Sequence, residues 1–306
     1  MYKKGEYMKL SSKVNKNRYA YAFIAPYFMA FFTFGVYPII YSIYLSFTKW
    51  GGTKASPKFI GLTNYERLIQ DTTFYNSIKN TLIMWTANII PQILFALFLA
   101  VALTSWRIKG KEFFRAIFYL PNLVTMASVG ILFRFLLDWQ TGALNSILIS
   151  LNIIKEPVNW LQEISATRGT VAFINWWMWF GNTMILLMAG IKTISDDIYE
   201  AAIVDGAGKW QTFKSITLPL LQPTMLYVVV TSLIGGLTMF DVPAVLTNGD
   251  GSPQGSILTM VMYLYNTAFK NYNFGYAGAI GVGLFVLILI AVIFAFKLIN
   301  RKPVYE

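Results

Sequence analysis

The chain has 306 residues and is 56% hydrophobic and 17% aromatic, while only 13% of its residues are charged. This charged fraction is about half of that in ordinary soluble domains, which argues against a soluble globular protein. The formal net charge is +11, and the chain contains no cysteine and no histidine. It therefore has no disulfide and no thiolate metal site, and it lacks the commonest metal ligand and proton shuttle, so we expect no metal centre.

Six apolar segments are long enough to cross a bilayer, which takes about 20 residues each. In chain order they cover about 19–47, 80–105, 113–137, 168–192, 223–246 and 276–298. A helix satisfies its own backbone hydrogen bonds in lipid, whereas a barrel would show short strands of alternating polarity. The sequence therefore predicts an all-α, polytopic membrane helix bundle over 19–302, preceded by a basic tail over 1–18. The segment 19–47 is too long for the apolar core of a signal peptide, so we expect it to be retained as the first helix.

Basic residues gather in four segments of the chain, 1–18, 107–115, 192–214 and 297–302. If the first of these is cytosolic, the alternation of six spans places all four on the same side of the membrane. An excess of Lys and Arg in cytosolic segments is the positive-inside pattern. We therefore expect both termini and the connection 193–222 in the cytosol, and we attribute the net charge to membrane anchoring rather than to nucleic-acid binding.

The other connections between the predicted spans differ in character. The short basic connection 106–112 predicts an antiparallel helix hairpin. The long connections 48–79 and 138–167 are expected on the outer side, the second with a short helix over 145–154. The last outer connection, 247–275, begins with a dense cluster of turn residues from Asn248 to Pro253.

The cytosolic connection 193–222 is polar and predicts two helices. Ser195 is a suitable N-cap, with two aspartates in the following turn, and Gly206 stands where a helix would end on a left-handed residue. A second short helix can begin near Lys209, and Pro219 and Pro223 are expected to break and restart the chain before the fifth span. From the residues alone, this segment is either an ordinary solvated connection or a docking element for a cytosolic partner.

The same connection carries the most specific motif in the chain. Glu200-Ala201-Ala202 is followed after three residues by Gly206, and nine residues later by Ile216-x-Leu218-Pro219. With this spacing the pattern resembles the EAA loop of bacterial ATP-binding-cassette (ABC) import permeases. Further marks resemble the carbohydrate branch of that family, which includes the maltose, lactose and glycerol-phosphate permeases, over about residues 19–300. They are Tyr37-Pro38, Gly61-Leu62-x-Asn64-Tyr65, Arg115-x-x-Phe118-x-Leu120-Pro121 and Leu246-Thr247-Asn248-Gly249.

The resemblance implies the six-span fold of a type I ABC importer permease in a bacterial inner membrane. Such a chain forms half of a pore and would pair with a second permease, as a heterodimer. Two cytosolic ATP-binding subunits and an extracytoplasmic sugar-binding protein would complete the importer. In this family the EAA helix sits in a cleft of the ATPase and couples ATP hydrolysis to movement of the spans. The residues expected to carry that coupling are Glu200, Ala201, Ala202, Gly206 and Pro219.

The chain itself shows no equipment for catalysis. Its nearest approach to a phosphate loop, Gly206-Ala207-Gly208-Lys209, lacks the long glycine spacing, and Trp210 stands where such a loop needs Ser or Thr. We therefore expect a transport subunit that is not an enzyme, has no catalytic residue and holds no cofactor of its own. ATP and Mg²⁺ would be bound by the partner subunits.

Sugar contacts are expected from the fourth and fifth spans. The run from Asn175 to Asn182 combines tryptophans with amides, which suit ring stacking and hydrogen bonds to sugar hydroxyls, although tryptophans there also fit an interfacial belt. By position, Asn175 and Trp177 match an Asn and a Trp of the maltose-type permeases, while Trp179 and Gly181 replace a glycine and a proline. The expected sugar contacts are Asn175, Trp177, Met178, Trp179, Asn182, Ser232, Met239 and Asp241.

In the fifth span the resemblance is weaker. Ser232, Gly235, Gly236 and Met239 occupy the matching positions, and only Ser232 is retained in kind. The two glycines either leave room for a different or longer sugar or allow close helix packing. Asp241 is expected in the middle of a span, where an acid would face the pore or a partner helix rather than lipid.

Two other classes of membrane protein fit less well. A secondary transporter usually carries several intramembrane ionisable residues, whereas this chain has Asp241, with Arg134 and Asp138 near the end of a span. An intramembrane enzyme would have to work without His, Cys or clustered carboxylates. Within the import permeases, a non-sugar solute such as glycerol phosphate is the alternative to a sugar.

Overall fold

The computed structural model describes residues 18–52, 56–105 and 108–299. The predicted basic tail lies outside these ranges, except for Arg18. Within the described residues the chain is mainly helical, with a two-stranded antiparallel sheet that pairs β1 (Thr48–Lys49) with β2 (Lys58–Phe59). In the same ranges five helices are long and apolar enough to cross a membrane, and a bent pair of helices supplies a sixth crossing if it counts as one span.

The five spans follow the order of the predicted apolar segments. The first runs over Arg18–Ser46 and contains a π-helical stretch, η1 (Phe31–Val36), ahead of α2 (Tyr37–Ser46). The others are α4 (Thr72–Ser105), α8 (Ile164–Lys192), α12 (Gln222–Leu237) continued by α13 (Asp241–Leu246), and α15 (Phe274–Ile299). Shorter helices in the connections are α3 (Thr63–Gln70), α7 (Ala143–Ser150), α14 (Met260–Tyr265) and the π-helical η4 (Asn266–Lys270).

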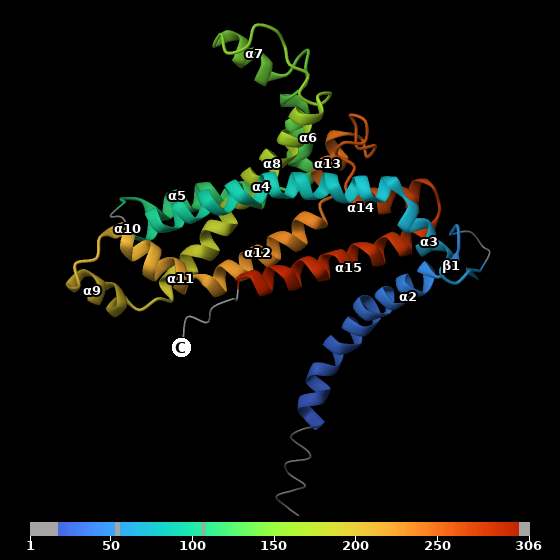
Figure 1. Ribbon diagram of the computed structural model, residues 1–306, viewed down its shortest axis with the longest axis horizontal. Helices are drawn as coiled ribbons and strands as arrows, with labels where there is room; N and C mark the ends of the chain where they lie inside the picture. The colour runs from blue at the N-terminus through green and yellow to red at the C-terminus, as the bar shows by residue number, and fades with distance from the viewer. Residues whose placement is uncertain (1–17, 53–55, 106–107, 300–306) are drawn as a thin grey trace, which may run out of the picture.

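Four long helices, α4, α8, α12 and α15, lie side by side and form the body of the molecule (Figure 1). The most extensive contact joins α4 to α8, where Ala96 and Ala100 are fully buried. Small side chains let membrane helices approach closely, which matters because lipid offers no hydrophobic driving force between them. The Gln92 Nε2 also donates a hydrogen bond to the Thr183 Oγ1 at 2.7 Å, a polar link within this largely apolar contact.

The predicted third span, 113–137, is not one straight helix. It consists of α5 (Lys111–Tyr119) with the 3-10 turn η2 (Leu120–Leu123), followed by α6 (Met126–Leu136), which is bent by 90° against them. Pro121 has no backbone N–H to continue an α-helix, and Val124 and Thr125 are extended. The Thr125 side chain then accepts a hydrogen bond from the Ser128 N–H and caps α6.

The predicted fifth span, 223–246, is also interrupted. The helix α12 ends at Leu237, and α13 begins only at Asp241. Gly235 and Gly236, which favour a helix least apart from proline, precede the break. The Thr238 Oγ1 bonds back to the Ile234 carbonyl at 2.8 Å and helps to close the end of α12. Asp241 is therefore the first residue of a short helix at the break, rather than a residue in mid-span as predicted.

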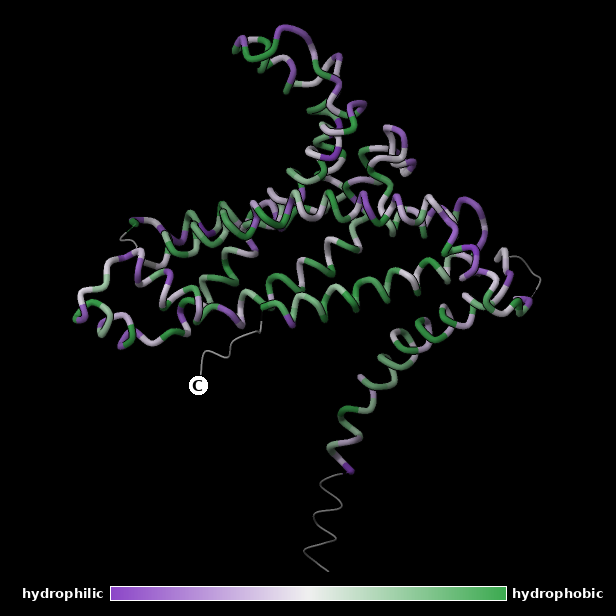
Figure 2. Tube along the Cα trace, in the orientation of Figure 1, coloured by the Kyte–Doolittle hydropathy of each residue, from purple (hydrophilic) through white to green (hydrophobic). Residues whose placement is uncertain are grey.

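Two parts of the chain project from the four-helix body (Figure 1). The first helix leaves near β1 and diverges from the bundle, and α6 with α7 points away on the opposite side. None of the most apolar window of the first helix is buried, and Phe23 and Phe34 are among its exposed side chains. Figure 2 shows this helix and α15 as predominantly hydrophobic. In a membrane, such surfaces contact lipid or another protein.

The first helix is held at its C-terminal end by residues near the sheet. The Asn64 Nδ2 donates to the backbone carbonyls of Ser46 and Thr48, both at 2.9 Å, and the Tyr65 hydroxyl lies 2.6 Å from the Ser46 Oγ. A Cβ added to Gly275 of α15 would lie 2.0 Å from the Thr48 carbonyl oxygen. The Asn64-Tyr65 pair and the close approach of α15 therefore hold the C-terminal end of the first helix.

The connection 193–222, the EAA loop, lies at the opposite end of the bundle (Figure 1). It contains α9 (Asp196–Val204), α10 (Lys209–Thr212), the π-helical η3 (Phe213–Thr217) and α11 (Leu218–Leu220). The end of α15 lies beside it, since the Gln222 Nε2 donates to the Ile299 carbonyl at 2.5 Å. As expected, the chain restarts at the prolines: Pro219 and Pro223 each stand in the first turn of a new helix, where the missing N–H is not needed, and Leu221 is a turn residue between α11 and α12.

Candidate functional site

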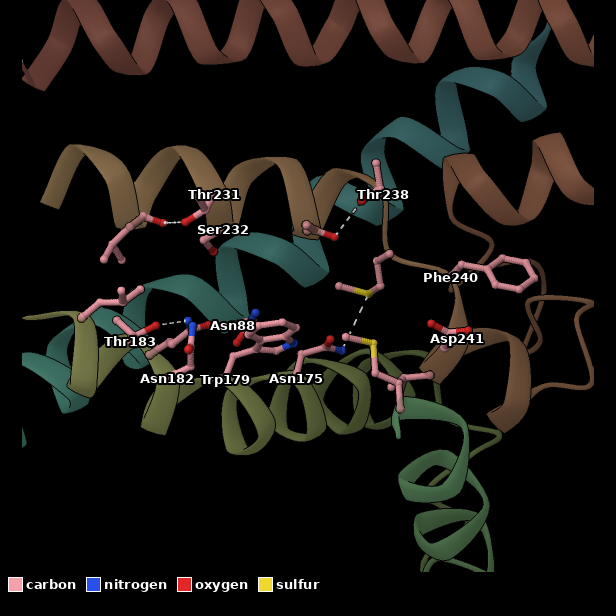
Figure 3. A pocket seen from close by; sticks show the side chains of 18 of the residues that line it. Asn88, Asn175, Trp179, Asn182, Thr183, Thr231, Ser232, Thr238, Phe240 and Asp241 are labelled. Carbon is pink, nitrogen blue, oxygen red and sulfur yellow. Dashed lines mark hydrogen bonds between the residues drawn. The ribbon is translucent and has the colours of Figure 1, made fainter. Parts of the chain in front are cut away.

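A cavity lies where α4, α8 and α12 meet the break before α13 (Figure 3). Its volume is about 410 Å³, which is in the range of small-molecule sites. Trp179, Tyr227 and Phe240 supply aromatic surface, and amides and hydroxyls supply most of the polar surface. The polar lining residues are Asn88, Gln92, Asn175, Asn182, Thr183, Thr231, Ser232, Thr238 and Asp241.

The predicted contacts Asn175, Trp179 and Asn182 come from one face of α8. They are four and three residues apart, so they fall on the same side of the helix, and all three line the cavity (Figure 3). The Asn175 Nδ2 donates to the Val171 carbonyl at 2.8 Å and contacts the Met239 Sδ at 3.8 Å. Met239, another predicted contact, lines the cavity from the break after α12.

The structure places two predicted contacts, Trp177 and Met178, away from the cavity lining. The Trp177 ring meets the Phe133 ring edge-on at 5.9 Å between centroids. Met178 is 2% exposed and belongs to the apolar core around Met84. Both side chains pack against neighbouring helices and neither lines this cavity, so a sugar contact at either residue stays a prediction without support from the cavity.

On α12, the predicted contact Ser232 lines the cavity opposite α8 (Figure 3). Its backbone carbonyl accepts a hydrogen bond from the Trp85 Nε1 at 3.1 Å. A Cβ added to Gly236 would lie 1.9 Å from the Trp85 Cδ1, whereas a Cβ added to Gly235 would meet nothing within 4 Å. Of the two roles considered for these glycines, Gly236 serves close packing and Gly235 leaves open space beside the cavity.

Sequence reasoning missed the contribution of α4. Asn88 and Gln92 stand one helical turn apart, are 5% and 3% exposed, and both line the cavity. Within the described residues, the Asn88 Oδ1 and the Gln92 Oε1 have no hydrogen-bond partner. The signal was present in the sequence, because Thr81, Asn88 and Gln92 recur at helical spacing within an apolar segment.

Asp241 brings a carboxylate to the cavity, and its position toward the pore of an importer stays a prediction. It lies with Phe240 at the end of the cavity where α12 gives way to α13 (Figure 3). Among the described lining residues it is the one that carries a charge. The cavity thus combines aromatic rings, neutral hydrogen-bonding groups and a single acid.

The helix α9 of the EAA loop is capped at both ends. The Ser195 side chain accepts a hydrogen bond from the Asp197 backbone N–H, so Ser195 is the N-cap of α9 as predicted. At the other end, the Gly206 N–H donates to the Ile203 carbonyl at 3.0 Å and the Ala207 N–H donates to the Ala202 carbonyl at 2.9 Å. Gly206 has a φ of 77°, so the predicted left-handed helix end is observed and has the hydrogen bonds of a Schellman motif.

The helix α9 presents a small and partly apolar surface at the end of the bundle. Glu200 and Ala201 are exposed, whereas Ala202 is 6% exposed and faces the rest of the loop. The Tyr199 hydroxyl lies 3.1 Å from the Thr217 Oγ1 and ties α9 to η3. A hollow of about 530 Å³ separates these two elements and is lined by Ala201 and Ala202 among others. The predicted coupling residue Pro219 lies beyond η3, in α11.

The Gly206–Lys209 segment has a structural role at the helix ends. Gly206 closes α9, and Gly208 is the N-cap of α10, which begins at Lys209. The described residues hold no group of three or more His, Cys, Asp or Glu side chains that could bind a metal ion.

At the opposite end of the bundle, Asp71 joins several helices. It stands between α3 and α4, and its carboxylate accepts hydrogen bonds from the Tyr263 hydroxyl of α14 and, at 2.5 Å, from the Tyr276 hydroxyl of α15. The Arg67 guanidinium lies 3.9 Å from the centroid of the Tyr276 ring. Burial opposes ionisation of Asp71, but these hydroxyls and two backbone N–H groups of α4 hold its pKa below the ordinary value. Burial and the Asp71 carboxylate raise the pKa of Tyr263 to about 12.

Helices long and apolar enough to span a membrane, a polar cavity among them and a helical loop at one end are together the arrangement expected of a transport permease. The chain belongs to the family of binding-protein-dependent transport system inner membrane components, whose model matches residues 81–303. This range contains the cavity-lining parts of α4, α8 and α12 and the whole EAA loop. The ABC import permease predicted from the loop is confirmed, and the chain is a multi-pass membrane protein.

Curated relatives cover nearly the whole chain. The lactose transport system permease protein LacF of Rhizobium radiobacter is 32% identical over 294 residues, which are 94% of this chain and 97% of that protein. The arabinooligosaccharides transport system permease protein AraP of Bacillus subtilis is 34% identical over 287 residues, with coverage of 93% and 89%. A solved chain of a bacterial alginate ABC transporter, in complex with an alginate pentasaccharide-bound periplasmic protein, is 26% identical with a TM-score of 0.82 and covers 96% of this chain and 98% of that chain. The all-α, type I ABC importer permease fold is therefore confirmed.

Proposed function

We propose that this chain is the membrane-spanning subunit of an ATP-driven importer and forms half of the translocation pathway for a sugar or oligosaccharide. The residues that line the cavity are the main support for this proposal. Trp179 offers a ring for stacking, and Asn175 and Asn182 on the same face of α8 offer amides for sugar hydroxyls. The curated relatives named above are permeases whose names specify lactose and arabinooligosaccharides, which supports a sugar as cargo.

The other half of the pathway would come from a second permease, as a heterodimer. The first helix is unburied along its most apolar window, and α6 exposes Phe135 at 73%. Exposed apolar surface of this extent is characteristic of interaction sites when lipid does not cover it. The first helix and α6 both project from the four-helix body in directions that a second bundle could occupy (Figure 1).

Two cytosolic subunits would bind ATP and Mg²⁺ and drive the cycle, so the chain needs no cofactor and no catalytic residue of its own. The surface they grip is α9, with Glu200 and Ala201 exposed and Gly206 closing the helix. An extracytoplasmic sugar-binding protein would deliver the cargo. The location that follows is a bacterial inner membrane, with both termini and the EAA loop in the cytosol.

The contacts of the loop provide a mechanical link from α9 to the cavity. Tyr199 of α9 bonds to Thr217 of η3, and η3 runs through α11 into α12, which lines the cavity with Ser232. The Gln222 side chain joins the start of α12 to the end of α15. The residues 193–195 also join α9 directly to α8, so a displacement of α9 by an ATPase would be transmitted to α8 through the chain and to α12 and α15 through these contacts.

The coupling role of Glu200 can be tested in the complete importer. Glu200→Gln removes one charge from the exposed face of α9, and Asp196→Asn is the matched control on the same helix. We expect Glu200→Gln to lower sugar-stimulated ATP hydrolysis and uptake about tenfold, because a hydrogen bond to a charged group contributes about 1.5–3 kcal/mol. The control variant should keep both activities. If Glu200→Gln assembled with the ATPase and transported at the normal rate, the coupling assignment would be wrong.

A further inference from the structure

The described lining of the cavity holds one charged side chain, which is an acid, and no cation. Asp241 is the charged group among the described lining residues, and it is an acid. The other polar groups of the lining are amides and hydroxyls, and no described Lys or Arg is among them. A ligand that carries a negative charge would therefore find no counter-charge from this chain.

The arginines on the helices that reach the cavity are engaged elsewhere. The Arg168 Nε at the start of α8 donates to the Ser256 carbonyl at 3.1 Å, and its Nη2 donates to the Asn80 Oδ1 at 2.6 Å. The Arg134 guanidinium at the end of α6 donates to the Asn248 side chain. Both guanidinium groups thus fasten connections between helices and cannot compensate an anion beside Asp241.

Asn88 and Gln92 also favour a neutral ligand over a negatively charged one. Both side chains are more than nine-tenths buried, and each keeps a terminal oxygen without a partner within the described chain. A buried acceptor without a donor is unfavourable, and both oxygens are themselves buried. A rotation of the amide that brings either oxygen to the cavity wall would therefore let a ligand hydroxyl donate to it at a gain. A sugar hydroxyl can donate to them, whereas an ionised carboxylate or phosphate group can only accept.

We propose that this cavity selects uncharged, hydroxyl-rich sugars and discriminates against uronates and sugar phosphates, with Asn88 and Gln92 receiving sugar hydroxyls and Asp241 repelling anions. This inference rests on the proposed function and narrows its substrate class. Asp241 is exposed, so solvent partly screens its charge, and a like charge about 4 Å away is opposed by about 1–4 kcal/mol. The fold alone does not determine whether the transported sugar is neutral or acidic, since a solved chain of the same fold belongs to a transporter of alginate, an acidic polysaccharide.

Competitive uptake tests the substrate class directly. Cells with the complete importer, and the same cells without this chain, are given a mixture of neutral oligosaccharides from starch, cellulose and arabinan together with uronate oligosaccharides from pectin and alginate. Mass spectrometry of the medium then reports which compounds are depleted only when the chain is present. We expect depletion of neutral oligosaccharides alone. Chain-dependent depletion of uronates would overturn this inference but leave a sugar importer, and no chain-dependent depletion of any sugar would overturn the proposed function as well.

The role of Asp241 is tested by removing its charge. We expect Asp241→Asn to raise the uptake of uronates relative to neutral sugars about tenfold, since one repulsive charge is lost. Asp250→Asn is the control, because Asp250 is an exposed acid of the following connection that bonds to Ser252 and does not line the cavity. An unchanged ratio in Asp241→Asn overturns the assignment of charge selection to this residue.

The role of the amides is tested with Asn88→Leu, a replacement of similar size. We expect the uptake of the transported neutral sugar to fall about three- to tenfold, the loss of one neutral hydrogen bond. The melting temperature of the purified chain should not fall, because the variant removes an unpartnered buried oxygen. Thr86→Val, on the same helix but outside the lining, is the control and should leave uptake unchanged. Normal uptake in Asn88→Leu, or a lower melting temperature that accounts for the loss, overturns the binding role.

Discussion

At the residue scale, the geometry of the EAA loop depends on a single backbone torsion. Gly206 has a φ of 77°, and its N–H and that of Ala207 close the C-terminus of α9. A side chain at this position would meet no atom within 4 Å, so the constraint is conformational and not steric. The left-handed conformation costs an L-residue roughly 1–2 kcal/mol, and glycine avoids that cost.

We predict that Gly206→Ala weakens coupling because it favours opening of the last turn of α9. ATP hydrolysis stimulated by the sugar-loaded binding protein should fall by a factor of about 5–30, the equivalent of 1–2 kcal/mol, with normal amounts of protein in the membrane. Gly208→Ala is the matched control, since Gly208 has a φ of −73° and equally open surroundings. Equal effects of the two substitutions would show that the torsion of Gly206 is unimportant.

Asp71 gives the end of the bundle that carries the sheet a dependence on pH. Its pKa in the folded chain lies below the ordinary value of 3.8, so the carboxylate stabilises the fold above that value and the contribution is lost as pH falls through the folded pKa. We expect Asp71→Asn to lower the melting temperature at pH 6, with the difference from wild type shrinking below about pH 4. The measurement is thermal unfolding in lipid nanodiscs across this range. A difference that is constant with pH would contradict the account.

At the scale of elements, the helix α8 determines how closely its neighbours pack. A Cβ on Gly181 would lie 1.9 Å from the Phe118 carbonyl oxygen, a backbone atom that cannot move without η2 and α5. We predict that Gly181→Ala destabilises the chain by about 1–3 kcal/mol or more, the usual cost of overpacking. Gly169→Ala, on the same helix with no atom within 4 Å, should be tolerated. The melting temperatures of the two purified variants provide the comparison, and equal values would contradict this packing.

The position of most elements could be predicted from the sequence, but their bends could not. Each long apolar run had to be helical in lipid, and α4, α8 and α15 occupy the expected regions. Proline alone does not locate a bend, since Pro91 lies inside the continuous helix α4, whereas Pro121 stands at a 90° turn. The difference comes from tertiary context and from the N-cap that Thr125 provides for α6.

The residues of the candidate site could also be predicted only in part from the sequence. Helical spacing places Asn175, Trp179 and Asn182 on one face of α8, and the structure brings all three to the cavity. Trp177 matches a family residue by position only, and its ring packs against Phe133 outside the lining of the cavity. Asn88 lies far away in the sequence on α4, and the packing of α4 against α8 and α12 brings it to the cavity.

At the scale of the whole molecule, the charges and the two ends of the bundle give a consistent orientation. The EAA loop and the end of α15 lie together at one end, and both carry the basic residues expected on the cytosolic side. The sheet, α3 and Asp71 lie at the other end (Figure 1). An ATPase that grips the loop would therefore act on one end of the helices that line the cavity, and a binding protein would meet the other.

This orientation can be tested by labelling, because the chain contains no cysteine and a single introduced thiol is unambiguous. Gly208→Cys places a thiol in the EAA loop, and Glu156→Cys places one in the connection between α7 and α8; both positions are exposed. We predict that a membrane-impermeant maleimide labels the Glu156→Cys chain in intact bacterial cells whose outer surface is accessible. The Gly208→Cys chain should be labelled only after the inner membrane is disrupted. Uptake measured on the unlabelled variants verifies that each chain is inserted and assembled. The reverse labelling pattern would place the loop outside the cell, where no ATPase could reach α9, and the positive-inside assignment and the coupling mechanism would then both be wrong.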